Sequence, residues 1–469
     1  MSKRNRKGLR HPLTGVALAV MLCMAPWQAG QAQEAAGDTL WERDTLTGDW
    51  GGSRSSISES GVDIGLEYIG EGMHVSSGGI KTGTTYEGRV ELSLDFDFGK
   101  LLNWENGTAH ISIFNIHNAN NRNAADYVGS LSDPSNIDAL RTNRLFTAWV
   151  QQDFGMGSFR IGQLAADDEF LTSDTAGGLI NGTFGWANLM SANLPSGGAA
   201  YPLATPGARL QLNFGSEVAM LVGVFAGDPA GKDCYRDDPD ANPQRCNRHG
   251  LEFSTSGGTF WIGELQYLVN QEEDASGLKG VYKLGAWYHT ASFADMRYGL
   301  DANGAIVSLA DPSVESDITH DGNYAIYGVI DQQVWRGEDA SASVFVRGGF
   351  TPKNRNLVSW YIDGGVGITG LIPGRSNDVL TVGIGYTHIS DDAADLDRDF
   401  LAIDGPPYPV RSEEVVYQLN YVAQITPWWT LQPNVQYISR PGGGVPDENN
   451  PAQRIGNAWI VGLRTTIAF

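Results

Sequence analysis

The 469-residue chain is poor in cysteine and in positive charge, and it lacks a long hydrophobic run after its first 32 residues. No later stretch reaches the roughly 18 apolar residues of a membrane-spanning helix, so none is predicted. The three cysteines have no CxxC spacing and no histidine-rich neighbour, which argues against a metal site. Lysine and arginine number 32 against 54 aspartates and glutamates, a formal charge of −22 that argues against nucleic acid as a partner.

The motifs of common enzymes are missing as well. Neither HExxH nor GxSxG occurs, and no serine or acidic partner is identifiable for the histidines in predicted strands. Gly365 to Gly370 fits the spelling GxGxxG, but its alternation continues a strand, which argues against a nucleotide site. The aspartate-rich run from Asp391 to Asp399 lacks the glycine and closing glutamate of a calcium loop, and we interpret it as a solvated external loop. We predict no enzyme, no cofactor and no metal.

The N-terminus has the pattern of a secretory signal. Five positive residues precede an apolar run from Leu13 to Ala25, and the small-residue site Gly30-Gln31-Ala32 follows. We expect residues 1–32 to be a signal peptide that is removed on export. The remaining chain then holds 27 lysines and arginines against 54 acidic residues, a formal charge of −27.

Two cysteines, Cys234 and Cys246, remain in a polar segment of the exported chain. In an oxidising compartment the favoured interpretation is a disulfide that closes this small loop, which would contribute about 2 to 3 kcal/mol by restricting the unfolded chain. The alternative is two unpaired thiols.

Alternating apolar and polar residues are the dominant pattern of the exported chain. With 59 glycines and 30 tryptophans and tyrosines, the composition fits either a soluble exported β protein or an outer-membrane barrel. The last residues alternate up to a terminal Phe469, with Arg464 on the polar side, as in a barrel wall between lipid and water. Sixteen such segments are predicted: 62–70, 85–98, 108–117, 144–154, 158–165, 208–215, 218–226, 259–269, 280–290, 323–334, 340–350, 358–370, 378–389, 413–425, 428–438 and 457–469.

The connections between these segments favour the barrel. Nearly every odd-numbered connection is longer than its even-numbered neighbours, which is the rhythm of long external loops and short periplasmic turns. We therefore predict an all-β fold, a sixteen-stranded antiparallel transmembrane β-barrel spanning residues 62–469. Residues 33–61 form a periplasmic N-terminal segment with a short helix, capped by Asp49 or Ser53 and stopped by Gly61. This segment is either a plug or a tether.

Several strings of the sequence are distinctive. They are Leu46-Thr47-Gly48-Asp49-Trp50-Gly51-Gly52-Ser53-Arg54, Gly61-Val62-Asp63, Arg160-Ile161-Gly162-Gln163 with Asp167, Asp168 and Phe170, Leu431-Gln432-Pro433-Asn434-Val435-Gln436-Tyr437-Ile438, Arg440-Pro441-Gly442-Gly443, Gly462-Leu463-Arg464 and Phe469. Together they resemble the signatures of the carbohydrate-selective porin family, the OprB type, of Gram-negative outer membranes.

The resemblance implies a sixteen-stranded outer-membrane channel for facilitated diffusion of monosaccharides and related small solutes. The alternative function is a less selective ion or amino-acid porin with the same wall. The expected partners are small sugars as transported solutes, outer-membrane lipid and lipopolysaccharide, the barrel-assembly machinery that recognises the terminal phenylalanine, and no nucleic acid. A monomer and a homo-oligomer are both compatible with the sequence.

Selectivity for a neutral sugar requires forked donors, carboxylate acceptors and an aromatic face, because each hydroxyl both donates and accepts a hydrogen bond. Charged residues on the polar faces of the predicted strands supply such groups, although they could also only satisfy one another. The third external connection, from Ala166 to Pro206, is unusually apolar and is expected to fold into the channel. Its Phe184 and Trp186 either offer the aromatic face or anchor the connection. The candidate constriction residues are Arg89, Glu91, Arg160, Trp186, Arg209, Arg347 and Arg464.

Overall fold

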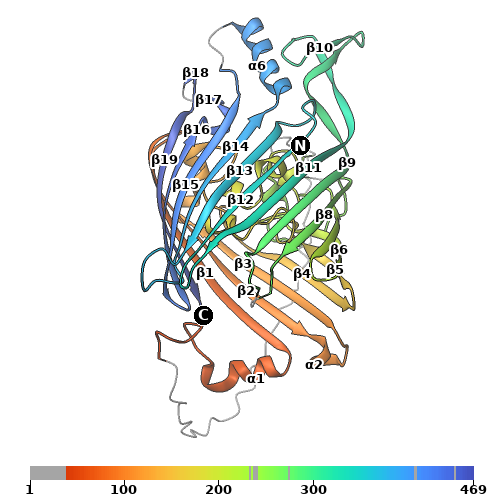
Figure 1. The fold of residues 1–469 in the computed structure, drawn as a ribbon. Coiled ribbons are helices and arrows are strands. Elements are labelled where there is room, and N and C mark those ends of the chain that lie inside the picture. The colour runs from red at the N-terminus through yellow and green to blue at the C-terminus, as the bar shows by residue number, and fades with distance from the viewer. Residues whose placement is uncertain (1–38, 232–233, 236–240, 273–274, 406–408, 448–449) are drawn as a thin grey trace, which may run out of the picture. The chain divides into compact units, whose positions relative to one another are not determined.

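A computed structural model describes residues 39–231, 234–235, 241–272, 275–405, 409–447 and 450–469. The predicted signal peptide lies outside these residues. Sixteen long antiparallel strands form one closed sheet (Figure 1). Their bounds are β1 Val62–Gly79, β2 Gly83–Asp97, β3 Gly107–Asn118, β4 Thr142–Phe154, β5 Gly157–Leu164, β6 Thr205–Phe214, β7 Val218–Ala226, β8 Thr259–Val269, β9 Gly280–Asp301, β11 Val314–Arg336, β12 Ser341–Phe350, β13 Val358–Thr369, β14 Val379–Ile389, β15 Glu413–Thr426, β16 Trp429–Ser439 and β19 Gly456–Ala468.

The sheet closes because its first and last strands pair. Tyr68 of β1 lies opposite Val90 of β2 on one side and opposite Ile467 of β19 on the other. Each other barrel strand pairs with its neighbours in sequence order, once the small additional strands are set aside. These are β10 Ile306–Ser308 at the edge of the β9–β11 hairpin and the pair β17 Pro446–Asp447 and β18 Asn450–Arg454. All sixteen predicted segments are barrel strands, which confirms the predicted fold.

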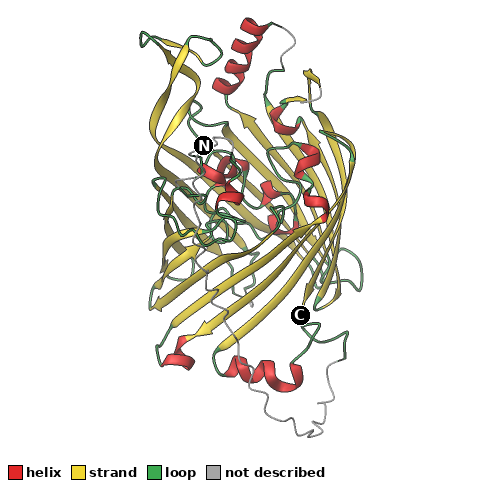
Figure 2. Cartoon of the chain, turned by 180° about the vertical axis from the view of Figure 1, so that it is seen from behind, coloured by secondary structure: helices red, strands yellow, loops and turns green. Residues whose placement is uncertain are grey.

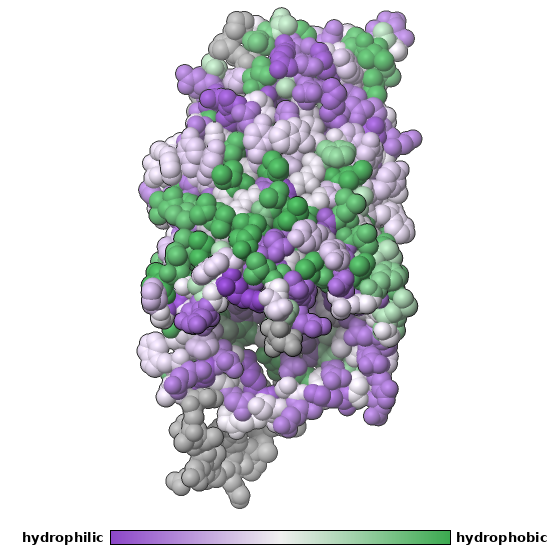
Figure 3. Space-filling view, viewed as in Figure 1, coloured by the Kyte–Doolittle hydropathy of each residue, from purple (hydrophilic) through white to green (hydrophobic). Residues whose placement is uncertain are grey.

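The wall is apolar outside and polar inside, the reverse of a soluble protein. On β15, Tyr417 and Leu419 are 43% and 46% exposed, whereas Gln418 and Asn420 between them are almost completely buried. On the face that Figure 3 shows, apolar residues gather in a band across the middle of the barrel, with polar residues above and below it. Because only a closed barrel satisfies the backbone of strands in lipid, this band indicates the membrane-embedded region.

Two predicted connections are replaced by extended hairpins. Residues 71–84 and 291–322 were expected to be loops, but β1 and β2 pair up to Val75 and Gly83, and β9 and β11 continue to Asp301 and Val314. The β9–β11 hairpin stands beyond the barrel rim beside helix α6, Asp391–Asp404 (Figure 1). The β9–β11 extension is largely solvated on both faces, so its sequence has no clear apolar–polar alternation by which to recognise it.

The run from Asp391 to Asp399 was expected to be a loop and forms most of α6 instead. Ser390 caps this helix by accepting a hydrogen bond from the amide of Ala393, and Asp391 and Asp392 occupy its first turn. Acidic residues are favourable there because they face the positive end of the helix dipole. We therefore did not predict this helix, although its capping residue is present in the sequence.

The remaining helical turns are short. They are η1 Trp50–Gly52, α1 Ser53–Glu59, α2 Phe98–Leu102, η2 Ala119–Asn121, α3 Ala125–Val128, η3 Ala176–Gly178, η4 Gly182–Phe184, α4 Asn188–Ser191, η5 Pro195–Gly197, α5 Pro243–Cys246 and η6 Pro441–Gly443. None of the helices in the described part of the chain is long and apolar enough to cross a membrane.

Helix α1 lies under the rim at which the chain ends (Figure 1). Gly52 is its N-cap, and Asp49 accepts hydrogen bonds from the amide and hydroxyl of Ser55, both at 2.8 Å. Arg54 donates to the backbone oxygen of the terminal Phe469 at 2.6 Å and to that of Ile64 at 3.2 Å. The helix is thus attached to both strands that close the barrel.

The third loop, residues 165–204 between β5 and β6, occupies the interior of the barrel (Figure 2). Its apolar residues pack against inward-facing residues of the wall: Phe184 is 3% exposed and lies edge-on to Phe345 of β12, 6.3 Å between ring centroids. Burial of this loop provides an apolar core in a lumen that is otherwise lined by polar groups. The sequence-based expectation that this loop folds inward agrees with the structure.

A charge on the outer band tests this orientation of the wall. Leu419→Arg is expected to lower the free energy of unfolding by about 2–4 kcal/mol, the range for arginine in the lipid-facing middle of a barrel. Ile306→Arg on β10, a position that is 67% exposed beyond the rim, is the control and should have little effect. Urea titration of protein folded into bilayers measures both, and equal losses would contradict the assignment of the band.

Candidate constriction site

An ion pair between the neighbouring strands β12 and β13 holds the third loop. Arg347 lies directly opposite Asp363, with 2.5 Å between Nη2 and a carboxylate oxygen, and both side chains are almost completely buried. The guanidinium also donates to three loop carbonyls: Leu171 at 2.9 Å, Gly185 at 3.0 Å and Thr183 at 3.0 Å. Every N–H of Arg347 is therefore used, which leaves no donor for a passing solute.

Wall carboxylates accept hydrogen bonds from backbone amides of the same loop. Glu264 of β8 accepts from the amide of Leu171 at 2.6 Å, and Asp331 of β11 accepts from that of Thr175 at 2.9 Å. Each bond satisfies a loop N–H that would otherwise be buried without a partner. Charged acceptors make these bonds stronger than neutral ones, so the loop is fixed at several points of the wall.

Arg464 has a similar structural position near the second loop, residues 119–141. It is 7% exposed, forms an ion pair with Glu71 of β1 and donates to Asn136 Oδ1 at 2.5 Å. The structure therefore places this candidate between two elements of the protein. Its remaining surface toward the lumen is small.

Arg160 and Arg209 come together on another part of the lumen wall, formed by β5 and β6. They are directly paired residues of β5 and β6, and both lie beside Glu169 of the third loop, at 3.5 Å and 2.7 Å. Gln151 of β4 accepts from Arg160 Nε at 2.9 Å and from Arg209 Nη2 at 3.0 Å. Side-chain exposure distinguishes the two arginines, because it is 18% for Arg160 and 2% for Arg209. Arg160 is thus the one that still faces the lumen.

Arg89 and Glu91 extend this group along β2. Arg89 lies 3.2 Å from Glu91 and 3.5 Å from Glu67, with side-chain exposures of 16%, 25% and 41%. Loop residue Asp168 lies within electrostatic range of both Glu91 and Arg160, and so connects the two parts. Enclosure in the barrel raises the pKa of Asp168 well above its ordinary value, and its acidic neighbours add to the shift. We call Arg89, Glu91, Arg160, Arg209 and Glu169 the constriction cluster.

Aromatic rings accompany the accessible arginines. The Arg160 guanidinium lies 3.8 Å from the ring centroid of Trp149 on β4, and that of Arg89 lies 4.6 Å from the ring centroid of Phe114 on β3. Tyr201 of the third loop lies 5.8 Å from Arg89 on another side. Forked donors, carboxylates and ring faces therefore share one region of the lumen, between the third loop and strands β2 to β6.

Trp186 lies away from the constriction cluster. It is 8% exposed, and its indole Nε1 donates to the Gly197 carbonyl of the same loop at 2.9 Å. The structure thus brings together Arg89, Glu91, Arg160 and Arg209, but it places Arg347, Arg464 and Trp186 in separate positions.

Trp149, Gln151 and Glu169 were not among the predicted site residues. The sequence from Arg144 to Phe154 shows no regular alternation because of a register shift against β3, between Ile111 and Ile113. A bulge of this kind changes the face to which the following residues point. The alternation of apolar and polar residues alone therefore could not show which residues of β4 face the lumen. Glu169 directly follows Asp167 and Asp168, which belong to one of the strings that resemble the family signatures.

A cavity of about 590 Å³ lies among the loops, and we call it the vestibule. The second and third loops provide most of its lining, together with Pro243 and Gln244 of the fourth loop, residues 227–258, and Leu357. Enclosure within the barrel raises the pKa of Asp133, whose side chain is open to the vestibule, and of Asp167, both in this lining, to about 6. Tyr201 lines the vestibule and also approaches Arg89, so the vestibule and the constriction cluster adjoin.

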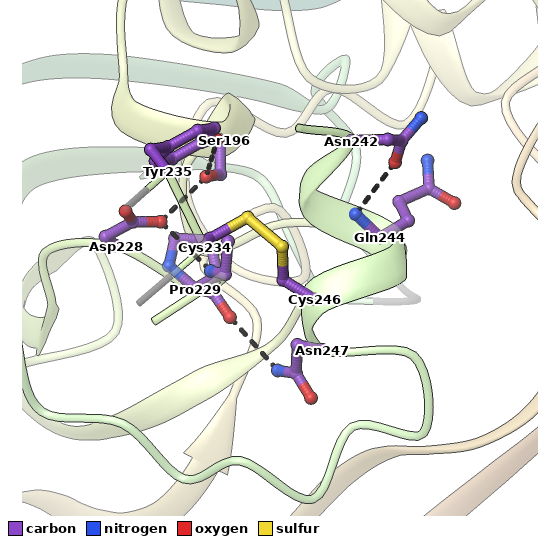
Figure 4. The surroundings of a disulfide bond; sticks show 10 residues. Ser196, Asp228, Pro229, Cys234, Tyr235, Asn242, Gln244, Cys246 and Asn247 are labelled. Atoms are coloured by element: carbon purple, nitrogen blue, oxygen red, sulfur yellow. Dashed lines mark hydrogen bonds between the residues drawn. A yellow bond between two sulfur atoms is a disulfide. The ribbon is translucent and has the colours of Figure 1, made fainter. Parts of the chain in front are cut away.

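The fourth loop is closed by a disulfide between Cys234 and Cys246, with 5.4 Å between their Cα atoms (Figure 4). Tyr235, next to the first cysteine, lies 2.8 Å from Ser196 of the third loop through their hydroxyls. Ser196 in turn donates to Asp228 at 2.7 Å. The disulfide-closed loop is thereby connected to the loop that forms the vestibule.

A closed barrel with an apolar outer band, a polar lumen and an inserted loop defines an outer-membrane porin. Comparison with known proteins identifies the family: the model of the carbohydrate-selective porins, OprB family, matches residues 81–469. The chain belongs to this family. It is an outer-membrane channel protein of a carbohydrate-selective class, which confirms the predicted recognition and location.

Individual relatives agree with this assignment. The chain is 26% identical to Porin B of Pseudomonas aeruginosa over 468 residues, 94% of each chain. It is 24% identical to OprB of Pseudomonas putida in a high-pH structure, with a TM-score of 0.78 over 92% of this chain and all of the other. A low-pH structure of the same protein aligns with a TM-score of 0.53 at 17% identity, over 92% of this chain and 99% of the other.

Removing the buried arginine tests the loop anchor. Arg347→Met leaves Asp363 buried without its partner, so the free energy of unfolding should fall by about 3–5 kcal/mol. The double variant Arg347→Met/Asp363→Leu removes the stranded charge and should recover most of this stability. Three loop carbonyls still lack their donor in both variants, so the single-channel conductance of both should exceed that of the wild type. A double variant with wild-type conductance would contradict the anchor.

Proposed function

We propose that the protein carries monosaccharides and related small neutral solutes across the outer membrane by facilitated diffusion past the constriction cluster. The observation that carries this proposal is the accessible Arg160, which lies over Trp149 and beside Glu169. A sugar hydroxyl can accept from the guanidinium while it donates to the carboxylate, and the contact with Trp149 holds the guanidinium in position. No bond is made or broken, and the solute gradient drives transport.

The pairing of charges in the cluster favours neutral solutes over ions. Arg160 and Arg209 share Glu169, and Arg89 lies between Glu67 and Glu91. Because these opposite charges largely cancel at short range, a neutral polyol gains hydrogen bonds while a small ion gains little net field. A less selective ion or amino-acid porin, the alternative function, would require an excess of one charge in the narrow region.

The ends of the chain fit export and insertion. We infer that residues 1–32 are a cleaved signal peptide, that residues 33–61 lie in the periplasm and that residues 62–469 form the barrel. In this orientation both termini of the mature chain lie on the periplasmic side, and the β9–β11 hairpin and α6 project outward to the lipopolysaccharide. The terminal Phe469, whose amide donates to Leu66 of β1 at 2.8 Å, is the proposed signal for the barrel-assembly machinery.

Substitutions in the cluster test the proposed function. Arg160→Ala should raise the half-saturating glucose concentration about tenfold, the effect of losing one hydrogen bond to a charged group. Trp149→Ala should raise it about threefold, since the cation–π contact that holds Arg160 in position contributes about 0.5–1 kcal/mol at such sites. Sugar flux is measured by swelling of proteoliposomes, and ion conductance is measured in planar bilayers.

The matched control is Arg398→Ala, an arginine of α6 beyond the rim with a side chain that is 59% exposed. It should leave sugar flux and conductance unchanged. Arg160→Ala should widen the channel, so its conductance should not fall when its sugar affinity does. Equal permeability of glucose in wild type and Arg160→Ala, or no sugar flux above that of a general porin, would refute the proposal.

A further inference from the structure

The vestibule is large enough to hold a solute of its own. Its volume of about 590 Å³ lies within the range of about 300–1,000 Å³ typical of small-molecule sites. Its lining comes from loops only, and the anchors described above fix the third loop to the barrel wall. The vestibule is therefore a formed cavity, distinct from the constriction cluster that it adjoins.

Charge in the vestibule is of one sign. The described residues that line it include Asp133, Asp138 and Asp167 but no lysine, arginine or histidine. Asp126 lies near enough to Asp133 to disfavour its ionisation further, so the surroundings add negative charge. This contrasts with the constriction cluster, where each acidic residue has an arginine beside it.

The three aspartates differ in how many hydrogen bonds their carboxylates accept from the protein. Asp138 is buried and accepts from the side chain of Asn123 and from the amide of Ala125. Asp167 accepts from the amide of Tyr201 at 2.9 Å with one oxygen, while its other oxygen is buried and has no hydrogen-bond partner among the described residues. Asp133 is exposed to the vestibule, and among the described residues its carboxylate has no hydrogen-bond or ion-pair partner. Asp133 is thus the acceptor that is open to a solute.

Ring faces lie in the same lining. Trp186 donates its indole N–H to Gly197, and Tyr201 donates its hydroxyl to the Ile137 carbonyl at 2.8 Å. Since the polar tips of both residues are occupied by backbone oxygens, what they offer to the vestibule is ring surface. Ring surface together with an unpaired carboxylate suits a polyol ring that carries a positive charge.

We propose that the vestibule is an outer binding site for amino sugars, in which the carboxylate of Asp133 takes the ammonium group of the solute. This inference rests on the proposed function, because it concerns a solute on its way to the constriction cluster. Neutral sugars bind there more weakly, since they bring no charge to Asp133. Sugar acids are disfavoured, because they bring a carboxylate into a cavity whose described lining has three carboxylates and no cation.

The test is the block of ion current by added solute in planar bilayers that contain the full mature chain. Glucosamine, glucose and gluconate serve as probes at pH 7, which lies above the raised pKa of Asp133 of about 6. Ionic strength is held constant, since salt screens the interaction. Glucosamine should block at about one tenth of the glucose concentration, the ratio that one charge-assisted hydrogen bond supplies. Gluconate should block least.

Asp133→Asn removes the charge and keeps the shape. In this variant the half-blocking concentration of glucosamine should rise to that of glucose, and gluconate should block better than in the wild type. The control Asp404→Asn, at an exposed position of α6 outside the vestibule, should keep the wild-type order. Heat-dependent gel mobility confirms that both variants form the barrel.

The outcomes separate this inference from the proposed function. Equal block by glucosamine and glucose in the wild type, or a glucosamine preference that survives Asp133→Asn, would overturn the vestibule site while leaving glucose permeation intact. Absence of glucose flux in proteoliposomes would refute the proposed function instead. A glucosamine preference that Asp133→Asn abolishes and Asp404→Asn retains supports the site.

Discussion

The buried ion pair of Arg347 and Asp363 is the interaction on which the channel depends. A sixteen-stranded barrel encloses a lumen too wide for side chains of the wall to fill, so selectivity requires another element inside it. That element is a loop, and a loop inside a protein brings backbone carbonyls and amides that need partners. Arg347 supplies donors to three such carbonyls while Asp363 balances its charge. The pair thereby makes an inserted loop compatible with burial.

Wall carboxylates solve the complementary problem for loop amides. Glu264 accepts from Leu171 of the third loop, and Glu87 of β2 accepts from Ala124 of the second. Glu414 of β15 accepts from the amides of both Leu131 and Gly442, so it joins the second loop to the connection after β16. Acidic residues that face the lumen are hence part of the loop scaffold. Glu87, Glu264 and Glu414 therefore have a structural role that is independent of any effect on solutes.

Period-two alternation located most of the barrel strands, because lipid on one side and polar groups on the other impose it. It did not predict the hairpin of β9 and β11, which has water on both sides. It also did not predict which residues of β4 face the lumen, because of the bulge there. For the site, the sequence identified inward-facing arginines but could not separate them by role. Arg160 and Arg347 both lie on polar strand faces, and only the position of the third loop leaves one of them accessible and covers the other. That position depends on pairings between residues far apart in sequence.

The charges of the constriction cluster are paired, whereas Asp133 of the adjoining vestibule is unpaired among the described residues. This difference affects the flux of solutes. In the constriction cluster, arginines and acids satisfy each other, so a solute must compete with existing ion pairs and gains little net binding energy. Weak binding at the constriction cluster allows rapid release, which diffusion through a channel requires. Asp133 in the vestibule has no such partner among the described residues, and it can attract a solute without closing the path. Capture and release are thus assigned to different residues, so either can change without the other.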